Sequence, residues 1–119
     1  MLHNARNPFI VVALVALAGC AARMAVTGDT RAGATLQSDV AQHVSNWAKV
    51  ETGCKQVDAI QTQLLRENPI GTGKSAAARQ YGSVDERWTV QLCGKTIPFA
   101  VTLTPDGKGG TFFSTSRER

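Results

Sequence analysis

Apolar and polar side chains alternate on both sides of Gly94–Lys95, and few folds accommodate such a pattern. The apolar positions are Trp88, Val90 and Leu92 before the glycine and Ile97, Phe99, Val101 and Leu103 after it. Because successive side chains of a strand point to opposite faces, each stretch predicts a β-strand with one buried face. A two-residue loop that begins with glycine favours a type II′ turn, which would pair Trp88 with Val101. All the large apolar residues then share one face of a hairpin.

A second turn and a third strand are predicted after this hairpin. Residues 105–110, Pro-Asp-Gly-Lys-Gly-Gly, are typical of a turn. Residues 111–115, Thr-Phe-Phe-Ser-Thr, favour a short strand. We expect the charged tail, residues 116–119, to be frayed. Two successive hairpins make an antiparallel meander, whose apolar face needs a cover.

A helical periodicity earlier in the chain supplies that cover. Apolar residues recur there at steps of four, four and three, namely Leu36, Val40, Val44 and Trp47. Gly53 stands where a helix C-cap is expected. The pattern predicts a helix over residues 36–51 that packs Trp47 against the core.

The segment that follows this helix, residues 54–66, leaves two alternatives open. Its apolar residues fit a helix, and residues 55–61 also fit a half-buried strand through Val57 and Ala59. The strand is favoured because pairing with the later hairpin would bring Cys54 beside Cys93.

Residues 67–84 contain several glycines and a proline and are expected to form a loop. Within them, Gly71 to Ser75 (Gly-Thr-Gly-Lys-Ser) looks like the end of a phosphate-binding P-loop. The first glycine of that motif is replaced by Asn68, and no buried strand precedes it. We therefore expect no nucleotide as a partner.

These elements predict an α+β domain, in which an N-terminal helix packs on a small antiparallel β-meander of three to four strands with one disulfide. The expected divisions are a leader (1–19), a flexible tether (20–35) and a single domain (36–116). The formal net charge of the chain is +4 and its charges are interspersed. This distribution is not that of a nucleic-acid-binding protein.

The leader has the three parts of a secretory signal peptide. It opens with polar residues and Arg6, continues with an unbroken apolar run over residues 9–18, and ends in small residues before Cys20. A membrane-spanning helix needs about 20 apolar residues. The run is shorter than that, so we expect cleavage rather than retention as an anchor.

The residues Leu17-Ala18-Gly19-Cys20 resemble the lipobox of bacterial lipoproteins. The resemblance covers about the first twenty residues. It implies that the thiol of Cys20 receives a diacylglycerol, and that a peptidase cuts between Gly19 and Cys20. The next residue is Ala21 rather than the aspartate that retains such proteins in the inner membrane. For a Gram-negative host, this implies a lipid-anchored protein of the outer membrane that faces the periplasm.

Two cysteines remain after Cys20, and they allow a single pairing. Export to an oxidising compartment predicts a disulfide between Cys54 and Cys93. In the chain-entropy model, a closed loop of about 40 residues stabilises the fold by roughly 3–4 kcal/mol. Two cysteines without a nearby histidine cannot fill a tetrahedral shell, so no metal site is expected.

The sequence offers no catalytic set. The only histidine after the leader, His43, lies beside the apolar stripe of the predicted helix and is expected to be a surface residue. The one adjacent carboxylate pair, Asp85–Glu86, lies on a predicted strand, where neighbours point to opposite faces. We therefore expect neither catalysis nor a cofactor.

Two functions from different classes remain. The first is a non-catalytic interaction or structural module that docks on an envelope protein or the cell wall, for instance through Arg87 and Gln91 on the polar sheet face. The second is an inhibitor or small-ligand binder that acts on an envelope enzyme through residues 67–84.

The domain also resembles small proteobacterial envelope lipoproteins and secreted proteins that have a tryptophan-bearing strand ending in Cys-Gly. The resemblance covers roughly residues 50–116. It is carried by Gly53-Cys54, Glu86-Arg87-Trp88-Thr89-Val90, Cys93-Gly94-Lys95 and Gly109-Gly110-Thr111-Phe112. It implies the fold and the compartment, and no activity.

Overall fold

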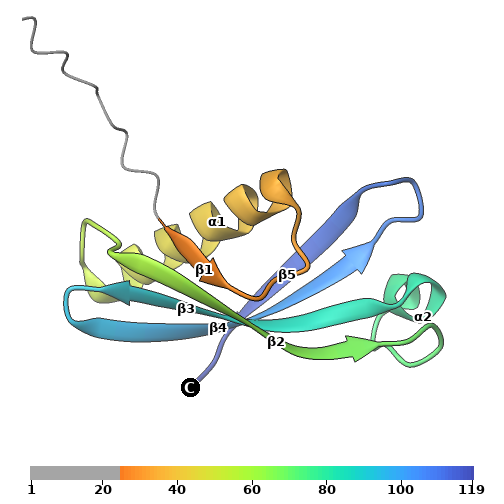
Figure 1. The fold of residues 1–119 in the computed structure, drawn as a ribbon. Coiled ribbons are helices and arrows are strands. Elements are labelled where there is room, and N and C mark those ends of the chain that lie inside the picture. Colours follow the sequence, from red (N-terminus) through yellow and green to blue (C-terminus); the bar gives the residue numbers. More distant parts are fainter. Residues whose placement is uncertain (1–24) are drawn as a thin grey trace, which may run out of the picture.

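The computed structural model describes residues 25–119, in which a twisted five-stranded sheet carries one long helix across a face (Figure 1). In chain order the elements are β1 (Val26–Gly28), α1 (Ala34–Thr52), β2 (Ala59–Asn68), α2 (Ala76–Tyr81), β3 (Ser83–Leu92), β4 (Lys95–Pro105) and β5 (Thr111–Arg117). The strand order is β1-β2-β3-β4-β5. β1 runs parallel to β2, and every other pair of neighbours is antiparallel. The sheet is therefore mixed, and the predicted antiparallel meander of three to four strands is wrong.

The parallel strand β1 is the element that overturns this prediction. It lies inside residues 20–35, which we expected to be a flexible tether, and α1 forms the crossover that parallel neighbours require. Val26 pairs with Ile60 and packs against the core. Three residues with one apolar side chain carry no readable periodicity, which is why the strand escapes sequence analysis. The tether expectation is wrong for residues 26–35.

Helix α1 begins two residues before the predicted helix and ends one residue after it. Gly53 has a φ of 72° and donates its N–H to the carbonyl of Lys49 (2.9 Å), which confirms the predicted C-cap. Trp47 is 37% exposed and contacts the ring of Phe99 with 5.3 Å between ring centroids. Trp47 therefore packs against the core through Phe99, as predicted, but from a half-exposed position at the margin of the core.

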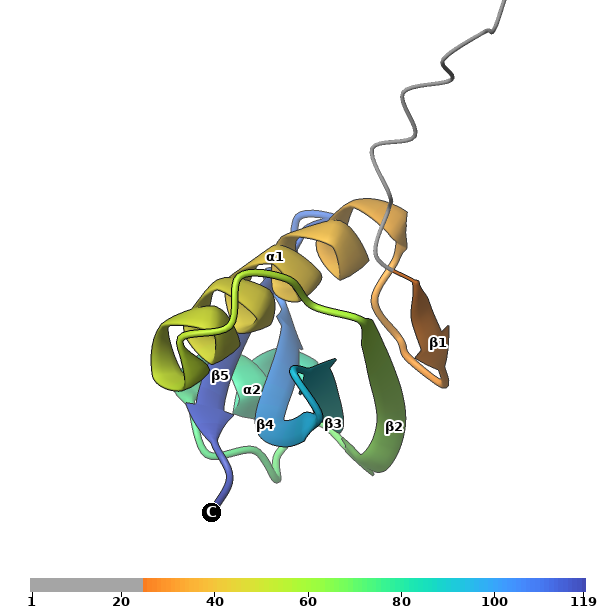
Figure 2. The same ribbon diagram turned by 90° about the vertical axis from the view of Figure 1, so that its left-hand side faces the viewer.

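The core fills the space between α1 and the sheet face that α1 covers (Figure 2). Its largest fully buried apolar side chains are Trp88, Phe99, Ile60, Leu92, Val40, Val44, Val90 and Val101. Burying each such side chain stabilises the fold by about 1.5–3 kcal/mol relative to leaving it exposed. The alternation predicted for residues 86–103 is confirmed, because the sheet-derived members of this set all come from one face.

The hairpin of β3 and β4 forms, but its register is shifted by two residues. Trp88 pairs with Phe99 rather than with Val101. The turn residues are Cys93 and Gly94, with φ values of 47° and 69°, the backbone pattern of a type I′ turn rather than the predicted type II′ turn. A shift by two keeps every side chain on its face, so the apolar pattern alone cannot distinguish the two registers.

Two further expectations need correction between α1 and β3. Residues 54–66, for which helix and strand were both possible, include the start of the strand β2. Its buried residues are Ile60 and Thr62, so the buried face is the opposite of the predicted one, which contained Val57 and Ala59. Residues 67–84 are not only a loop, because they include the end of β2 and the helix α2. Ser75 caps α2 by accepting a hydrogen bond from the N–H of Ala78 (3.0 Å).

The predicted fraying of residues 116–119 is also wrong for most of this tail. Arg117 forms an ion pair with Glu51 of α1 (2.9 Å). Glu118 forms an ion pair with Arg87 of β3 (2.6 Å), and its N–H donates to the carbonyl of Pro98 (3.1 Å). β5 therefore runs to Arg117, and ion pairs with α1 and β3 hold Arg117 and Glu118 in place.

Candidate functional site

Glu86 is a carboxylate with no solvent exposure at the centre of the fold. Its two oxygens accept three hydrogen bonds: from the hydroxyl of Thr30 (2.8 Å), the backbone N–H of Arg31 (2.6 Å) and the indole N–H of Trp88 (2.8 Å). None of the ion pairs formed by residues 25–119 involves this carboxylate. Glu86 thus fastens the loop between β1 and α1 to the middle of the sheet.

The alternation of the sequence already indicates this burial. Glu86 is in phase with Trp88, Val90 and Leu92, so it lies on the face that the alternation predicts to be buried. Its neighbour Asp85 lies on the opposite face, as expected for adjacent residues of a strand. The structure therefore separates the carboxylate pair instead of bringing it into one cleft.

The other face of the sheet is polar, and a β-bulge helps to organise it. The pairing of β2 with β3 shifts between Leu64 and Arg66, which moves Arg66 onto the same face as Asp85. Asp85 there accepts hydrogen bonds from Arg66 (3.0 Å), Asn68 (2.9 Å) and Thr102 (2.9 Å). We call this surface the outer face.

These contacts lower the pKa of the Asp85 carboxyl. Burial acts to raise its pKa, but the hydrogen bonds from Asn68, Arg66 and Thr102 and the charge of Arg66 together outweigh burial. The pKa of Asp85 is consequently lower than its usual value of 3.8.

Asp85→Asn is expected to reduce the free energy of unfolding at neutral pH by about 1–2 kcal/mol, because charge-assisted hydrogen bonds are lost. A lowered folded-state pKa contributes stability that is present above the unfolded-state value, near 3.8, and is lost as the pH falls through the folded-state pKa. The difference between the wild type and the variant should therefore shrink in acid. Urea unfolding at a series of pH values measures it, with the exposed Asp58→Asn as control. An unchanged difference at the lowest pH would contradict this assignment.

Arg87 and Gln91, which the sequence placed on the polar face, both lie on the outer face. The Arg87 side chain is 40% exposed and donates from Nε to the carboxylate of Glu118 (2.6 Å). This hydrogen bond and the negative charge of Glu118 raise the pKa of the Arg87 guanidinium, which stays protonated. The outer face thus presents charges and amides along β2 and β3, and the 63%-exposed Phe112 of β5 lies on the same face.

Helix α2 closes one end of the outer face and borders a cleft. Its Ala78 is buried, and α2 contacts β4, whose Thr104 is only 9% exposed. Beside it is a cleft of about 400 Å³, whose walls include the largely exposed Ile70 and the half-exposed Tyr81. This cleft is the structural counterpart of the predicted binding loop at residues 67–84.

His43 serves to hold α1 on β5. Its Nε2 lies 2.8 Å from the hydroxyl of Thr115, and its ring meets Trp47 and Phe113 edge-on. These partners are a hydroxyl and two aromatic rings, so the geometry gives this histidine a packing role.

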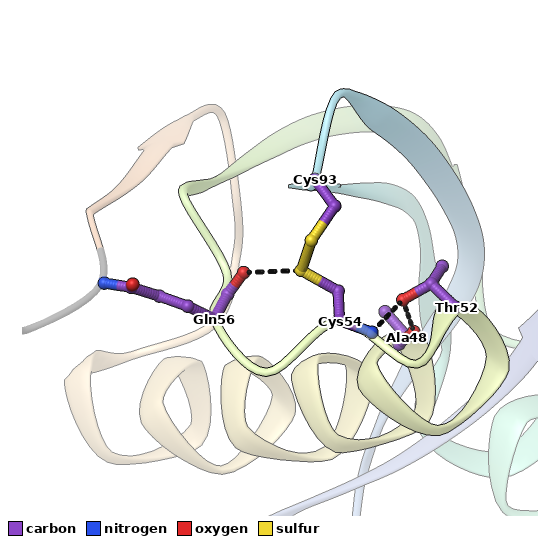
Figure 3. Close-up of a disulfide and its surroundings, with 5 residues drawn as sticks. All are labelled: Ala48, Thr52, Cys54, Gln56 and Cys93. Atoms are coloured by element: carbon purple, nitrogen blue, oxygen red, sulfur yellow. Dashed lines mark hydrogen bonds between the residues drawn. A yellow bond between two sulfur atoms is a disulfide. The ribbon is translucent and has the colours of Figure 1, made fainter.

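The predicted disulfide between Cys54 and Cys93 is confirmed (Figure 3). It joins the end of α1 to the turn between β3 and β4, with 6.1 Å between the two Cα atoms. Thr52 supports this corner, because its hydroxyl donates to the carbonyl of Ala48 (2.7 Å) and accepts from the N–H of Cys54 (3.2 Å). The Cys54 sulfur also lies 3.3 Å from the carbonyl oxygen of Gln56. This is a close contact and not a hydrogen bond, because a disulfide sulfur has no proton to donate.

The residues predicted for lipidation and cleavage, Cys20 and Gly19, lie outside the described part of the chain. Within residues 25–119, no group of three or more potential metal ligands is found, and no helix is both long and apolar enough to cross a bilayer. Comparison of the chain with protein-family models, curated proteins and solved structures finds no match.

Proposed function

We propose that this protein is an exported lipoprotein, anchored through Cys20, whose domain is a non-catalytic interaction or structural module of the cell envelope. The observation that carries the proposal is the lipobox Leu17-Ala18-Gly19-Cys20 behind a short apolar run. The disulfide between Cys54 and Cys93 supports it, because such bonds persist in oxidising compartments. For a Gram-negative host, Ala21 favours the outer membrane.

Cys20→Ser is the variant that tests the anchor. It removes the thiol that would carry the diacylglycerol, so the variant should lose its acyl mass and accumulate as an uncleaved precursor or a soluble protein. Mass spectrometry of the N-terminal peptide and fractionation of cells measure both effects. Gly19→Ala, which keeps a small residue before the cysteine, is the matched control and should be processed normally. A Cys20→Ser variant that is still cleaved and membrane-bound would refute the anchor.

The outer face is the surface we propose for recognition of an envelope partner. Its fixed charges and amides fit a polar partner surface better than an apolar ligand. Arg87→Ala/Gln91→Ala should therefore reduce recovery of a partner from detergent-solubilised envelopes by tenfold or more, roughly the effect of 1.4 kcal/mol. Equal recovery with this variant and the wild type would exclude the outer face.

The second candidate, an inhibitor or small-ligand binder, is favoured by the cleft beside α2. Deleting residues 70–79 would remove part of α2 and its cap, so a point substitution is the sharper probe. Ile70→Ser changes the 71%-exposed side chain at the cleft with little effect on packing. Binding that is lost with Ile70→Ser and kept with Arg87→Ala/Gln91→Ala would favour this alternative over the outer face.

A further inference from the structure

Ala25, the first described residue, lies at one end of the sheet. The carbonyl of Ala25 accepts a hydrogen bond from the N–H of Ile60 (3.2 Å), next to the start of β2. The end of α1, the disulfide and the β3–β4 turn lie at this same end (Figure 1). We call it the disulfide end, formed by residues 49–58 and 92–96 together with Ala25.

The distance from the lipid to this end is short, because β1 begins at Val26, inside the expected tether. Under the proposed function, Cys20 is held at the bilayer surface, and Ala25 follows five residues later. Five residues span at most about 18 Å when fully extended. The ten residues of β3 extend over about 33 Å, so this tether restrains the disulfide end directly and leaves α2, at the other end of the sheet, unrestrained. The disulfide end is therefore the part of the domain held nearest to the bilayer.

The chemistry of the disulfide end suits an anionic lipid surface. It carries Lys49, Lys55 and Lys95, of which Lys55 and Lys95 are exposed. Of its acidic residues, Glu51 is neutralised by its ion pair with Arg117 (2.9 Å), which leaves Asp58.

An apolar side chain is also exposed where α1 ends, next to Lys49 in the chain. Val50, in the last turn of α1, is 86% exposed, more than any other large apolar residue in the described part of the chain. Exposed lysines and an exposed apolar side chain at the same end of a domain are typical of surfaces that bind the headgroup region of membranes.

We propose that the disulfide end is a membrane-contact surface that binds anionic phospholipid headgroups through Lys55 and Lys95, with Val50 at the interface. This inference rests on the proposed lipid anchor at Cys20. Contact at this end leaves the cleft beside α2, at the opposite end of the sheet, away from the headgroups and open to a partner.

Lysine reactivity on vesicles tests the contact directly. Residues 20–119 contain every described residue, and Cys20 is their only free thiol, because Cys54 and Cys93 are bonded. The thiol is coupled to a maleimide lipid in vesicles of phosphatidylcholine, with or without phosphatidylglycerol. An amine-reactive reagent and mass spectrometry then give the labelling rate of each lysine.

On the anionic vesicles, Lys55 and Lys95 should react roughly fivefold more slowly than on phosphatidylcholine alone, the effect expected for one lysine near an anionic surface. Lys74 and Lys108, which are exposed near α2 and in the β4–β5 turn, are internal controls and should be unaffected. High salt should abolish the difference. Equal slowing of all four lysines, or of none, would overturn the proposal.

Matched double variants give a second measurement. Lys55→Gln/Lys95→Gln should weaken sedimentation of the uncoupled chain with anionic vesicles by roughly twentyfold. Lys74→Gln/Lys108→Gln removes the same charge from the far end and should leave it nearly unchanged. Equal loss in both variants would show a general charge effect and overturn the surface. Because chemical coupling bypasses cellular lipidation, failure here leaves the anchor standing, whereas failure of the anchor is detected separately with Cys20→Ser.

Discussion

Cys54→Ala/Cys93→Ala is expected to lower the free energy of unfolding by about 4 kcal/mol. The bond closes a loop between residues 39 positions apart, so its loss returns a large chain entropy to the unfolded state. A domain of about 100 residues has a net stability of only about 5–15 kcal/mol, so the variant should be marginally folded at best.

Urea unfolding followed by tryptophan fluorescence measures this effect. The slope of the unfolding free energy against urea should also rise, because an unfolded chain without the bridge exposes more surface. Wild-type protein in a thiol reductant is the control, and its stability should match that of the variant. A variant within about 1 kcal/mol of the oxidised wild type would show that the bond adds little to the folded state.

Glu86→Leu is expected to cost about 3 kcal/mol or more, although it replaces a buried charge by an apolar side chain. The substitution leaves the hydroxyl of Thr30, the N–H of Arg31 and the indole N–H of Trp88 without their acceptor. A buried donor left unpaired costs about 1–3 kcal/mol, which applies in full to the indole N–H of Trp88. The bonds from Thr30 and Arg31 are partly buried, so their loss costs less for each donor and also loosens the loop between β1 and α1.

Two further substitutions distinguish the contribution of the Glu86 carboxylate to stability from that of its hydrogen-bond donors and from a general loss of charge. Trp88→Phe keeps most of the ring and removes one donor, so it should soften the effect of Glu86→Leu in a double-mutant cycle. Glu67→Gln changes a carboxylate that is 59% exposed and should alter stability by less than about 0.5 kcal/mol. If Glu86→Leu were as stable as the wild type, the loop would not depend on this carboxylate.

The sequence predicts those parts of the fold that repeat a pattern over many residues. The stripe from Val40 to Ala48 and the alternation from Trp88 to Leu103 are long enough to identify α1, β3 and β4. The hairpin register was missed because two registers that differ by two residues bury the same side chains. Only the backbone of Cys93 and Gly94 distinguishes them, through the positive φ values that a type I′ turn requires.

The other errors come from contacts between residues far apart in the chain. β1 pairs with β2 alone, and its three residues are too few to show an alternation in the sequence. The position of Arg66 depends on a bulge that no local signal marks. The disulfide was predictable because two cysteines permit one pairing, whereas Glu86 was read as a polar strand residue although its phase placed it on the buried face.

The three-residue strand β1 also determines how the domain responds to a pull on the chain before Ala25. Such a force loads β1 along its length, and its few hydrogen bonds to β2 are the first to yield. Their release frees residues 26–29 and adds at most about 14 Å of slack. The hydrogen bonds from Thr30 and Arg31 to Glu86 then form a second stop. Residues 26–29 can thus extend under force before any load reaches the core beyond Glu86.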